Sequence, residues 1–340
     1  MRAVYPKNQG TDIKTLTVLF NTWPAAFDCP GGGEVQLLGY EENLTALGLR
    51  VLRYDQWNPR PQFDAADLVH WFSMQGGCSR FLIHVRETRR LPLLISPIVW
   101  LDRPEKYDLA EIGRLLGMAD HILPNSLAEC AQLAGLFHLP PERFTPIVNG
   151  ADEPFFEPVP PELFREHSGV RDPFVLCMGN LEKRKNQLRL IEALAGSGLH
   201  LVLAGQEREA DYAAACRALA GATVHFTGRL EYGSALQRSA YAAAEILCLP
   251  STLETPGLAA LEAAAVGCRL ALTREGCARE YFGDFAVYLD PYDSADIKRA
   301  IGEALSGPKN PALPGFVRER YTWKRAAQQL ASVYRQFSAK

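Results

Sequence analysis

Short apolar runs alternate with amphipathic stretches along most of the 340-residue chain. The apolar runs are rich in Val, Leu, Ile and Phe, which favours buried strands, and the stretches between them have the spacing of helices. Such alternation is typical of parallel sheets covered by helices, so we predict an α/β protein. In the first half, strands are expected at residues 16–20, 50–54, 67–72, 93–99, 121–124 and 144–148, and a helix at 34–47.

A second alternation follows residues 153–173, which contain five prolines and are interpreted as a linker. Another Pro- and Gly-rich link is expected at 307–315, before a last helix at about 323–337. The chain is long enough for two domains of ordinary size. Between the two links, strands are expected at 174–178, 200–204, 223–226, 246–250, 269–272 and 286–289, and helices at 186–194, 210–219, 234–244 and 294–305.

The composition is that of a globular protein, with 47% hydrophobic and 22% charged residues. A net charge of -3 gives no reason to expect a nucleic-acid partner. The eight cysteines contain no C-x-x-C pair, which favours a reducing compartment. The N-terminus lacks the apolar core of a signal peptide, and the longest apolar run, 91–101, is too short to cross a bilayer. We therefore expect a cytoplasmic protein.

Three arginines precede that run on a predicted helix, namely Arg86, Arg89 and Arg90. They have two explanations. Peripheral contact with an anionic membrane surface is one of them. A solvated helix face is the favoured one.

Two glutamates, Glu254 and Glu262, lie on either side of a junction between a strand and a helix. Pro256 suits the first helical position, because no amide hydrogen bond is lost there, and Thr255 can cap the helix. Gly267 suits the end of the helix. The first glutamate then lies in the loop at the carboxyl end of the strand, and the second lies on the helix.

Ligands of open α/β sheets bind at this edge of the sheet. The unpaired amides at the start of the helix, those of Gly257, Leu258 and Ala259, would point at an anion bound there.

This segment resembles the E-x7-E signature of retaining glycosyltransferases of the GT-B fold, in particular family 4. Two glutamates at this spacing alone would indicate only a solvated helix face; the neighbouring residues make the resemblance specific. It implies that Glu254 contacts the donor hexose near the reacting carbon and that Glu262 holds the ribose hydroxyls. The matching residues are Pro250, Ser251, Glu254, Gly257, Leu258, Glu262, Ala263, Ala265 and Gly267.

The resemblance covers nearly the whole chain. It implies a GT-B fold, with two Rossmann-like domains facing each other across a cleft. Residues 1–160 would bind the acceptor and residues 161–322 the nucleotide-sugar donor, and the helix in 323–340 would pack back onto the first domain. The further matching elements are Gly31–Glu34, Ala119–Asp120 with Asn125–Ser126, Val148–Gly150, Asp290–Pro291 and Trp323 with Tyr334.

Basic residues follow the strand predicted at 174–178, in the sequence GNLEKRKN. The family places a basic pair here on the donor diphosphate, and by position Arg184 and Lys185 take that role. Fixed cations stabilise a departing diphosphate more in the transition state than in the ground state. A solvated helix start is the alternative. Asn180 is a candidate for the donor site by its position, but it departs from the pattern, because many relatives carry a second phosphate-binding arginine there.

Several glycines end predicted strands or begin predicted helices. Glycine permits close approach to a ligand, and the family uses a loop like Gly32–Gly33 to cover the diphosphate. The backbone at Gly228, Arg229 and Leu230 would read the nucleobase, and Gly205 would line the same crevice. An ordinary turn at a strand end is the alternative for these positions. The chain contains no G-x-G-x-x-G motif, which argues against a nicotinamide dehydrogenase.

The acceptor side carries fewer signals. Many relatives have a histidine in a T-x-H element after the strand predicted at 93–99, whereas this chain has Ser96, Pro97 and Ile98. His70 is a substitute candidate, although a structural, hydrogen-bonded histidine is the favoured explanation. Trp100 and Asp102 lie near the same rim and are candidates for the acceptor site.

No metal-binding pattern is present: there is no H-x-x-x-H, no cysteine cluster and no D-x-D beside a strand. We predict no metal and no cofactor, with a nucleoside-diphosphate sugar as co-substrate. Arg184, Lys185 and the helix amides would do the work of a cation.

The sequence thus predicts an enzyme that moves a hexose from a nucleoside-diphosphate sugar to an acceptor hydroxyl with retention of configuration. The acceptor would be a saccharide, a lipid-linked molecule or a peptide hydroxyl in the biosynthesis of a polysaccharide, glycolipid or other glycoconjugate. Two alternatives stay open: a catalytically silent nucleotide-sugar-binding or scaffold protein, and a GT-B-type nucleotide-sugar epimerase.

Overall fold

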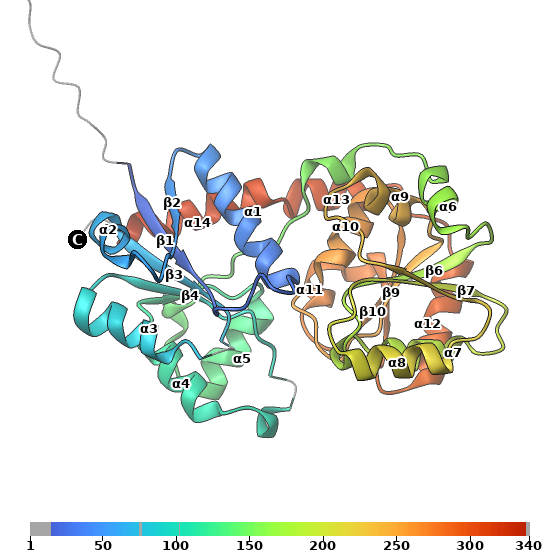
Figure 1. Ribbon diagram of the computed structural model, residues 1–340, viewed down its shortest axis with the longest axis horizontal. Coiled ribbons are helices and arrows are strands. Elements are labelled where there is room, and N and C mark those ends of the chain that lie inside the picture. Colours follow the sequence, from blue (N-terminus) through green and yellow to red (C-terminus); the bar gives the residue numbers. More distant parts are fainter. Residues whose placement is uncertain (1–14, 75–76, 102, 338–340) are drawn as a thin grey trace, which may run out of the picture.

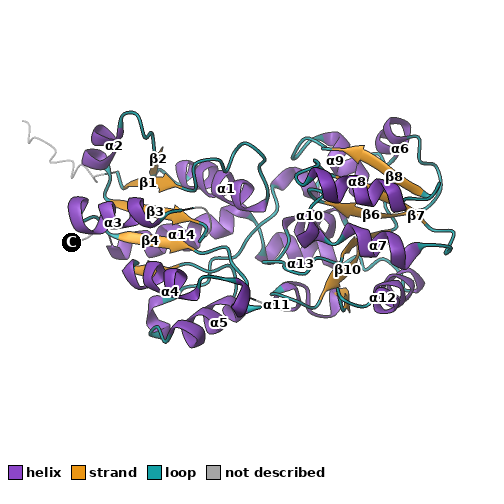
Figure 2. Cartoon of the chain, turned by 60° about the horizontal axis from the view of Figure 1, so that its bottom comes forward, coloured by secondary structure: helices purple, strands orange, loops and turns teal. Residues whose placement is uncertain are grey.

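The computed structural model describes residues 15–74, 77–101 and 103–337 and shows two α/β units side by side (Figure 1). The first unit is built on a five-stranded sheet of order β2-β1-β3-β4-β5, and the second on a six-stranded sheet of order β11-β10-β9-β6-β7-β8. Neighbouring strands are parallel in both sheets. Helices cover both faces of each sheet (Figure 2), so the predicted α/β fold is confirmed.

The elements of the first unit match the alternation in the sequence. The strands are β1 (Thr17–Asn21), β2 (Arg50–Arg53), β3 (Leu68–Phe72), β4 (Leu93–Ser96) and β5 (His121–Ile122). The helices are α1 (Gly32–Ala46), α2 (Pro59–Ala65), α3 (Ser79–Ile83), the π-helix His84–Arg89, α4 (Leu109–Met118) and α5 (Leu127–Phe137).

The second unit follows the predicted elements closely. Its strands are β6 (Phe174–Met178), β7 (His200–Ala204), β8 (Val224–Gly228), β9 (Ile246–Leu249), β10 (Arg269–Thr273) and β11 (Ala286–Leu289). The helices from here to the end of the described chain are α6 (Glu162–Ser168), α7 (Gln187–Leu194), α8 (Ala210–Leu219), α9 (Ala235–Ala243), α10 (Leu258–Val266), α11 (Ala278–Phe282), α12 (Ser294–Ser306), α13 (Leu313–Arg320) and α14 (Trp323–Phe337).

Two strand predictions were too long because of prolines. The strand expected at 144–148 is reduced to a single bridge between Phe144 and Ile122. Pro146 follows closely and has no amide to continue the ladder. Likewise β4 ends at Ser96, since Pro97 comes next and Ile98 has a left-handed φ of 48°.

The segment 153–173 is not a linker. It contains the 3-10 turn Glu153–Phe156 and helix α6. Phe155 and Phe164 are fully buried in the core of the second unit. Prolines suit helix starts as well as linkers, so proline content alone misled the prediction. The link predicted at 307–315 similarly contains the first turn of α13.

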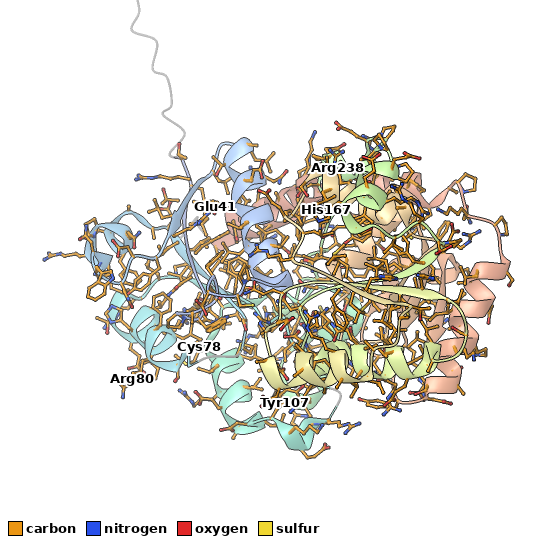
Figure 3. The ribbon with its side chains drawn as sticks, turned by 45° about the vertical axis from the view of Figure 1, so that its right-hand side comes forward. Glu41, Cys78, Arg80, Tyr107, His167 and Arg238 are labelled. Carbon is orange, nitrogen blue, oxygen red and sulfur yellow. The ribbon has the colours of Figure 1, made fainter. Side chains whose placement is uncertain are left out.

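Arg86 and Arg89 are partly buried and form ion pairs with Asp120 and Asp64 of the first unit, so they do not stand free on a solvated face. The exposed Arg80 points out of the first unit (Figure 3). Within the described residues, none of the helices has the length and apolar character needed to span a bilayer.

The chain crosses between the units twice, and the two crossings run side by side. The amide of Ala151 donates to the carbonyl of Tyr321 over 2.9 Å. Helix α14 then packs along α1 in the first unit (Figure 1), where Trp323 and Tyr334 are buried in the same core as Tyr40. This packing places the amino end of α1, which belongs to the site described below.

Gly39 in α1 lies directly against α14, since a Cβ there would lie 2.6 Å from Cδ2 of Trp323. We expect Gly39→Ala to lower the free energy of unfolding by about 1–3 kcal/mol, since the buried indole has to move. The matched control is Gly302→Ala in α12, where a Cβ meets nothing within 4 Å. It should raise stability by about 0.5–1 kcal/mol through helix propensity. Urea unfolding measures both, and equal effects would refute the packing.

Candidate active site

The turn between β9 and α10 differs from the sequence-based expectation. Helix α10 begins at Leu258 after Gly257, which has a φ of 91°, and the Thr255–Pro256 peptide bond is cis. The predictions that Thr255 caps the helix and that Pro256 begins it are therefore wrong. The predicted end at Gly267 is confirmed, because this residue caps α10 in the left-handed conformation.

Glu254 and Lys185 form a buried ion pair. Nζ of Lys185 donates to Oε1 of Glu254 over 2.5 Å, and the hydroxyl of Ser251 donates to the same oxygen over 2.7 Å. Burial alone would raise the pKa of Glu254, but Lys185 and Arg184 outweigh it and hold the pKa below its usual range. The carboxylate is thus ionised at neutral pH, and two residues predicted to act on the donor are in direct contact.

Arg184 lies beside this pair. Its guanidinium donates to the carbonyl of Leu253 over 3.0 Å and to Oε1 of Glu182 over 2.7 Å. The Arg184 side chain is 39% exposed, so it is fixed on one side and open to solvent on the other. The structure therefore brings both predicted cations to the turns that follow β6 and β9.

Glu262 lies on α10 with only 4% of its surface exposed. Its Oε2 accepts hydrogen bonds from the hydroxyl of Tyr241, at 2.6 Å, and from Nε2 of Gln237, at 3.2 Å. Burial raises the pKa of Glu262 to about 7, and the nearby Asp152 adds to this effect. Tyr241, Gln237 and Asp152 carry no sequence signal, because they are far from the E-x7-E segment in the chain.

Two of the glycines predicted to contact the donor, Gly205 and Gly228, lie at the carboxyl ends of β7 and β8. A Cβ on Gly205 would lie 1.9 Å from the carbonyl oxygen of Gly179, so only glycine fits there. The amide of Gly205 donates to the carbonyl of Gly228 over 2.9 Å. Gly205, Gly228 and Arg229 line a cavity of about 240 Å³, whereas Leu230 is buried in the core of the second unit.

Two helices, one from each unit, begin close together at the interface. Gly31 caps α1, and its amide donates to Oε2 of Glu34 over 2.7 Å. A Cβ on Gly32 would be 3.7 Å from Cδ1 of Leu258, the first residue of α10. Gly33 follows in the same turn of α1. Because helix amino ends attract anions, the convergence of α1 and α10 forms a candidate anion site.

The loop before α1 contacts the second unit through polar groups. Nδ2 of Asn180 donates to the carbonyl of Pro30 over 3.5 Å. Arg208, on the loop between β7 and α8, donates to the carbonyl of Cys29 and pairs with Glu182 over 3.2 Å. Arg208 has no motif to mark it, and sequence reasoning missed it.

Helix α11 of the second unit docks on the first unit. Glu280 accepts hydrogen bonds from the amides of Leu127 and Ala128 at the start of α5, over 2.8 and 3.0 Å. The hydroxyl of Tyr281 donates to the carbonyl of Asn125 over 2.5 Å and accepts from the amide of Asn149 over 3.0 Å. These contacts hold the two units together on the side of the Glu254 turn.

The structure does not bring His70 to this interface. The His70 side chain is fully buried, with Nδ1 2.6 Å from the hydroxyl of Tyr334 and Nε2 2.9 Å from the hydroxyl of Ser96. Burial lowers the pKa of the imidazole to about 3, so it stays neutral. Both ring nitrogens are engaged, which corrects the acceptor-binding prediction in favour of the structural explanation.

The other two candidates for the acceptor site are Trp100 and Asp102. Trp100 is half-buried, and its carbonyl oxygen lies 3.5 Å from the hydroxyl of Tyr107. Asp102 lies outside the described residues. Within residues 15–74, 77–101 and 103–337, no group of three or more His, Cys, Asp or Glu side chains is placed to hold a metal ion. Independence of a metal and of a cofactor stays a prediction.

The ion pair can be tested through its effect on stability. We expect Lys185→Met to lower the free energy of unfolding by about 3 kcal/mol at pH 7, because it leaves the Glu254 carboxylate buried without its cation. Lys183→Met, at an exposed lysine in the same turn, is the control and should change it by less than about 0.5 kcal/mol.

The pH dependence follows from the same pair. In the wild type the pKa of Glu254 is lowered, so the stability from this pair persists until the pH falls well below the carboxyl's usual range. Without Lys185, burial raises the pKa of Glu254. Protonation of this carboxyl then removes the cost of burying its negative charge as the pH falls from 7 to 5. Urea unfolding at both pH values should show the difference between wild type and Lys185→Met narrowing; a constant difference would contradict this account.

Known proteins resemble this chain in sequence and in fold. The chain is 30% identical to a D-inositol 3-phosphate glycosyltransferase of Thermobispora bispora over 249 residues, which cover 65% of this chain and 57% of that protein. It is 25% identical over 383 residues to a protein of the same name from Geodermatophilus obscurus, covering 98% and 82% of the two chains. The match thus spans just over half the length of the Thermobispora protein.

Solved structures share the fold over nearly the whole chain. Sucrose-phosphate synthase of Thermosynechococcus elongatus superposes with a TM-score of 0.81 at 19% identity, covering 96% of this chain and all of the other. HepE of Anabaena, solved in complex with UDP-glucose, gives a TM-score of 0.76 at 19% identity, covering 94% and 100%. The fold is therefore GT-B, as the sequence resemblance implied.

A family model supports the same assignment. The model described as glycosyl transferases group 1 matches residues 161–329. This range contains the whole segment from Ser251 to Gly267 and the basic turn before α7. This match assigns residues 161–329, which include the second sheet and its helices, to the group 1 glycosyl transferases.

Proposed function

We propose that this protein is a glycosyltransferase that moves a hexose from a nucleoside-diphosphate sugar to an acceptor hydroxyl, with retention of configuration. The observation that carries the proposal is the meeting of Lys185, Glu254 and the amino ends of α1 and α10 at the carboxyl edges of the two sheets. The reaction would serve the biosynthesis of a polysaccharide, glycolipid or other glycoconjugate.

The diphosphate is the group that this site suits best. As the bond from the sugar to the leaving oxygen breaks, negative charge grows on the diphosphate. Lys185, Arg184 and the helix amides of Gly257, Leu258 and Ala259 would stabilise this charge. These groups are held in place before the substrate arrives, so little reorganisation is needed during the reaction.

Glu254 would orient the hexose. Its Oε1 is engaged by Lys185 and Ser251, and its Oε2 lies 3.2 Å from where a Cβ on Gly257 would be. Glycine at position 257 therefore keeps the approach to this oxygen open. An ionised carboxylate here would accept hydrogen bonds from sugar hydroxyls and balance positive charge at the reacting carbon.

Glu262 and the neighbouring cavity would hold the nucleoside. Ribose hydroxyls can donate to the Glu262 carboxylate, and the cavity at Gly205, Gly228 and Arg229 is the candidate base pocket. HepE, which shares the fold, was solved in complex with UDP-glucose, and this supports a nucleotide-sugar donor. The first unit would supply the acceptor site, and the relatives' name supports a hydroxylated acceptor.

Calorimetric binding of UDP, GDP and ADP is the experiment that tests the donor site. We expect micromolar binding of one of the three and about tenfold or greater weakening in Glu262→Gln, because hydrogen bonds to a charged group are lost. Glu303→Gln, at an exposed glutamate of α12, is the matched control and should bind like the wild type. Absence of binding by all three nucleotides would overturn the donor-site assignment.

Turnover then separates the alternatives. A transferase should slowly hydrolyse its donor sugar without an acceptor, and a silent binding protein should not. An epimerase would convert the sugar instead of releasing it, which product analysis reveals. The anomeric configuration of the product, measured by NMR, tests retention.

The pH dependence of nucleotide binding tests the role of Glu262. Its pKa of about 7 means that half of the carboxyl groups are protonated at neutral pH in the free protein. Ribose binding favours the ionised form, so affinity should rise about tenfold between pH 6 and pH 8 and level off above. In Glu262→Gln the phosphates of the nucleotide still titrate, but the rise in affinity due to ionisation of Glu262 should be lost. Identical profiles of affinity against pH in both proteins would contradict the role assigned to Glu262.

A further inference from the structure

The cations beside the candidate diphosphate site are already balanced by carboxylates. Lys185 is paired with Glu254, and Arg184 is paired with Glu182, which is only 5% exposed. A bound diphosphate brings several further negative charges between the two units. Additional positive charge is therefore needed at the place where the two helix amino ends meet.

Asn180 cannot supply that charge. It lies two residues after the end of β6, and its neutral amide donates to the carbonyl of Pro30, in the loop before α1. A neutral side chain at this position contributes hydrogen bonds but no net attraction for phosphate.

Arg208, on a different loop, places a positive charge near the amino end of α1. Gly31 is the residue that caps α1. The Nη1 and Nη2 atoms of Arg208 lie 3.8 and 3.9 Å from where a Cβ on Gly31 would be. Figure 1 shows this amino end of α1 directed at the second unit. The next residue, Gly32, faces Leu258 at the start of α10. Arg208 thus lies beside the point at which both helices begin.

The surroundings of Arg208 favour a bound anion. A cation at a helix amino end is unfavourable with the helix dipole unless negative charge is present. Glu182, which is shared with Arg184, pairs with Arg208, and Oε2 of Glu34 also lies at this helix end, 3.6 Å from the same Cβ position on Gly31. The contacts to Glu182 and to the carbonyl of Cys29 use two of the five N–H donors of the guanidinium, and the side chain is 31% exposed. The remaining donors suit phosphate oxygens.

We propose that Arg208 is a diphosphate-binding residue of the donor site and supplies, from the loop after β7, the positive charge that position 180 lacks. The proposal rests on the donor site proposed above. Its hydrogen bond to Cys29 also ties the loop before α1 to the second unit, so the same guanidinium links the helix amino end of one unit to the phosphates held by the other.

The test compares three probes on the wild type and on Arg208→Gln: the nucleoside diphosphate selected among UDP, GDP and ADP, its parent nucleoside, and pyrophosphate. Affinity for the diphosphate and for pyrophosphate should fall about tenfold or more in the variant, and affinity for the nucleoside should be unchanged. The salt dependence of diphosphate binding should also become weaker, because one ionic contact is lost.

Arg299→Gln is the matched control. Arg299 makes the same kinds of contact as Arg208, to the carboxylate of Asp296 and to the carbonyl of Tyr288, but it lies on α12 away from the site. It should leave all three affinities unchanged. Asn180→Arg in the Arg208→Gln background should restore diphosphate affinity, because residue 180 contacts the same loop before α1.

The outcomes are distinct. Equal weakening of nucleoside and diphosphate in Arg208→Gln would show that Arg208 only fastens the loop before α1, and unchanged binding would show no role; both would overturn the proposal. If the wild type bound none of the nucleotides, the proposed donor site would be refuted, and the proposed role of Arg208 would be refuted with it. Thermal melting of each variant confirms that it is folded.

Discussion

The buried ion pair between Lys185 and Glu254 is the interaction on which the site depends. It joins the turns that follow β6 and β9, which are neighbouring strands at the middle of the second sheet. Taking both charges out of water is costly, so the pair needs further hydrogen bonds, and Ser251 supplies one. Room for the turn comes from Gly276, where a Cβ would lie 2.0 Å from the carbonyl oxygen of Glu254.

The turn that carries Glu254 is held from the first unit as well. The side-chain amides of Asn125 and Asn149 donate to the carbonyl of Thr255, each over 3.4 Å, and Tyr281 binds the backbone of both asparagines. On the other side, Arg208 reaches the loop before α1. The charged groups of the second unit and the amino end of α1 are therefore placed by one connected set of contacts, and a ligand between the units would meet both at once.

Most of the architecture was predictable because apolar runs and helical spacing are local properties of the chain. The strand at β7 and the helices α8 and α14 have the predicted bounds, and the turn at Gly267 follows from the conformational freedom of glycine. Errors arose where one residue type suits two structures. Proline occurs both in linkers and at helix starts, so the prolines of the segment that buries Phe155 and Phe164 predict a linker where the structure has helices.

The alternation of strands and helices and the charged residues at the strand ends follow from the amino-acid sequence, since both depend on neighbours in the chain. How these residues act depends on the tertiary structure. It buries Glu262, and this burial raises the pKa of the carboxyl although Tyr241 donates a hydrogen bond to it. It places His70 in the core against Tyr334. It also brings Arg208 to the amino end of α1. Burial and charge at these sites come from residues far apart in sequence, and no local pattern records such contacts.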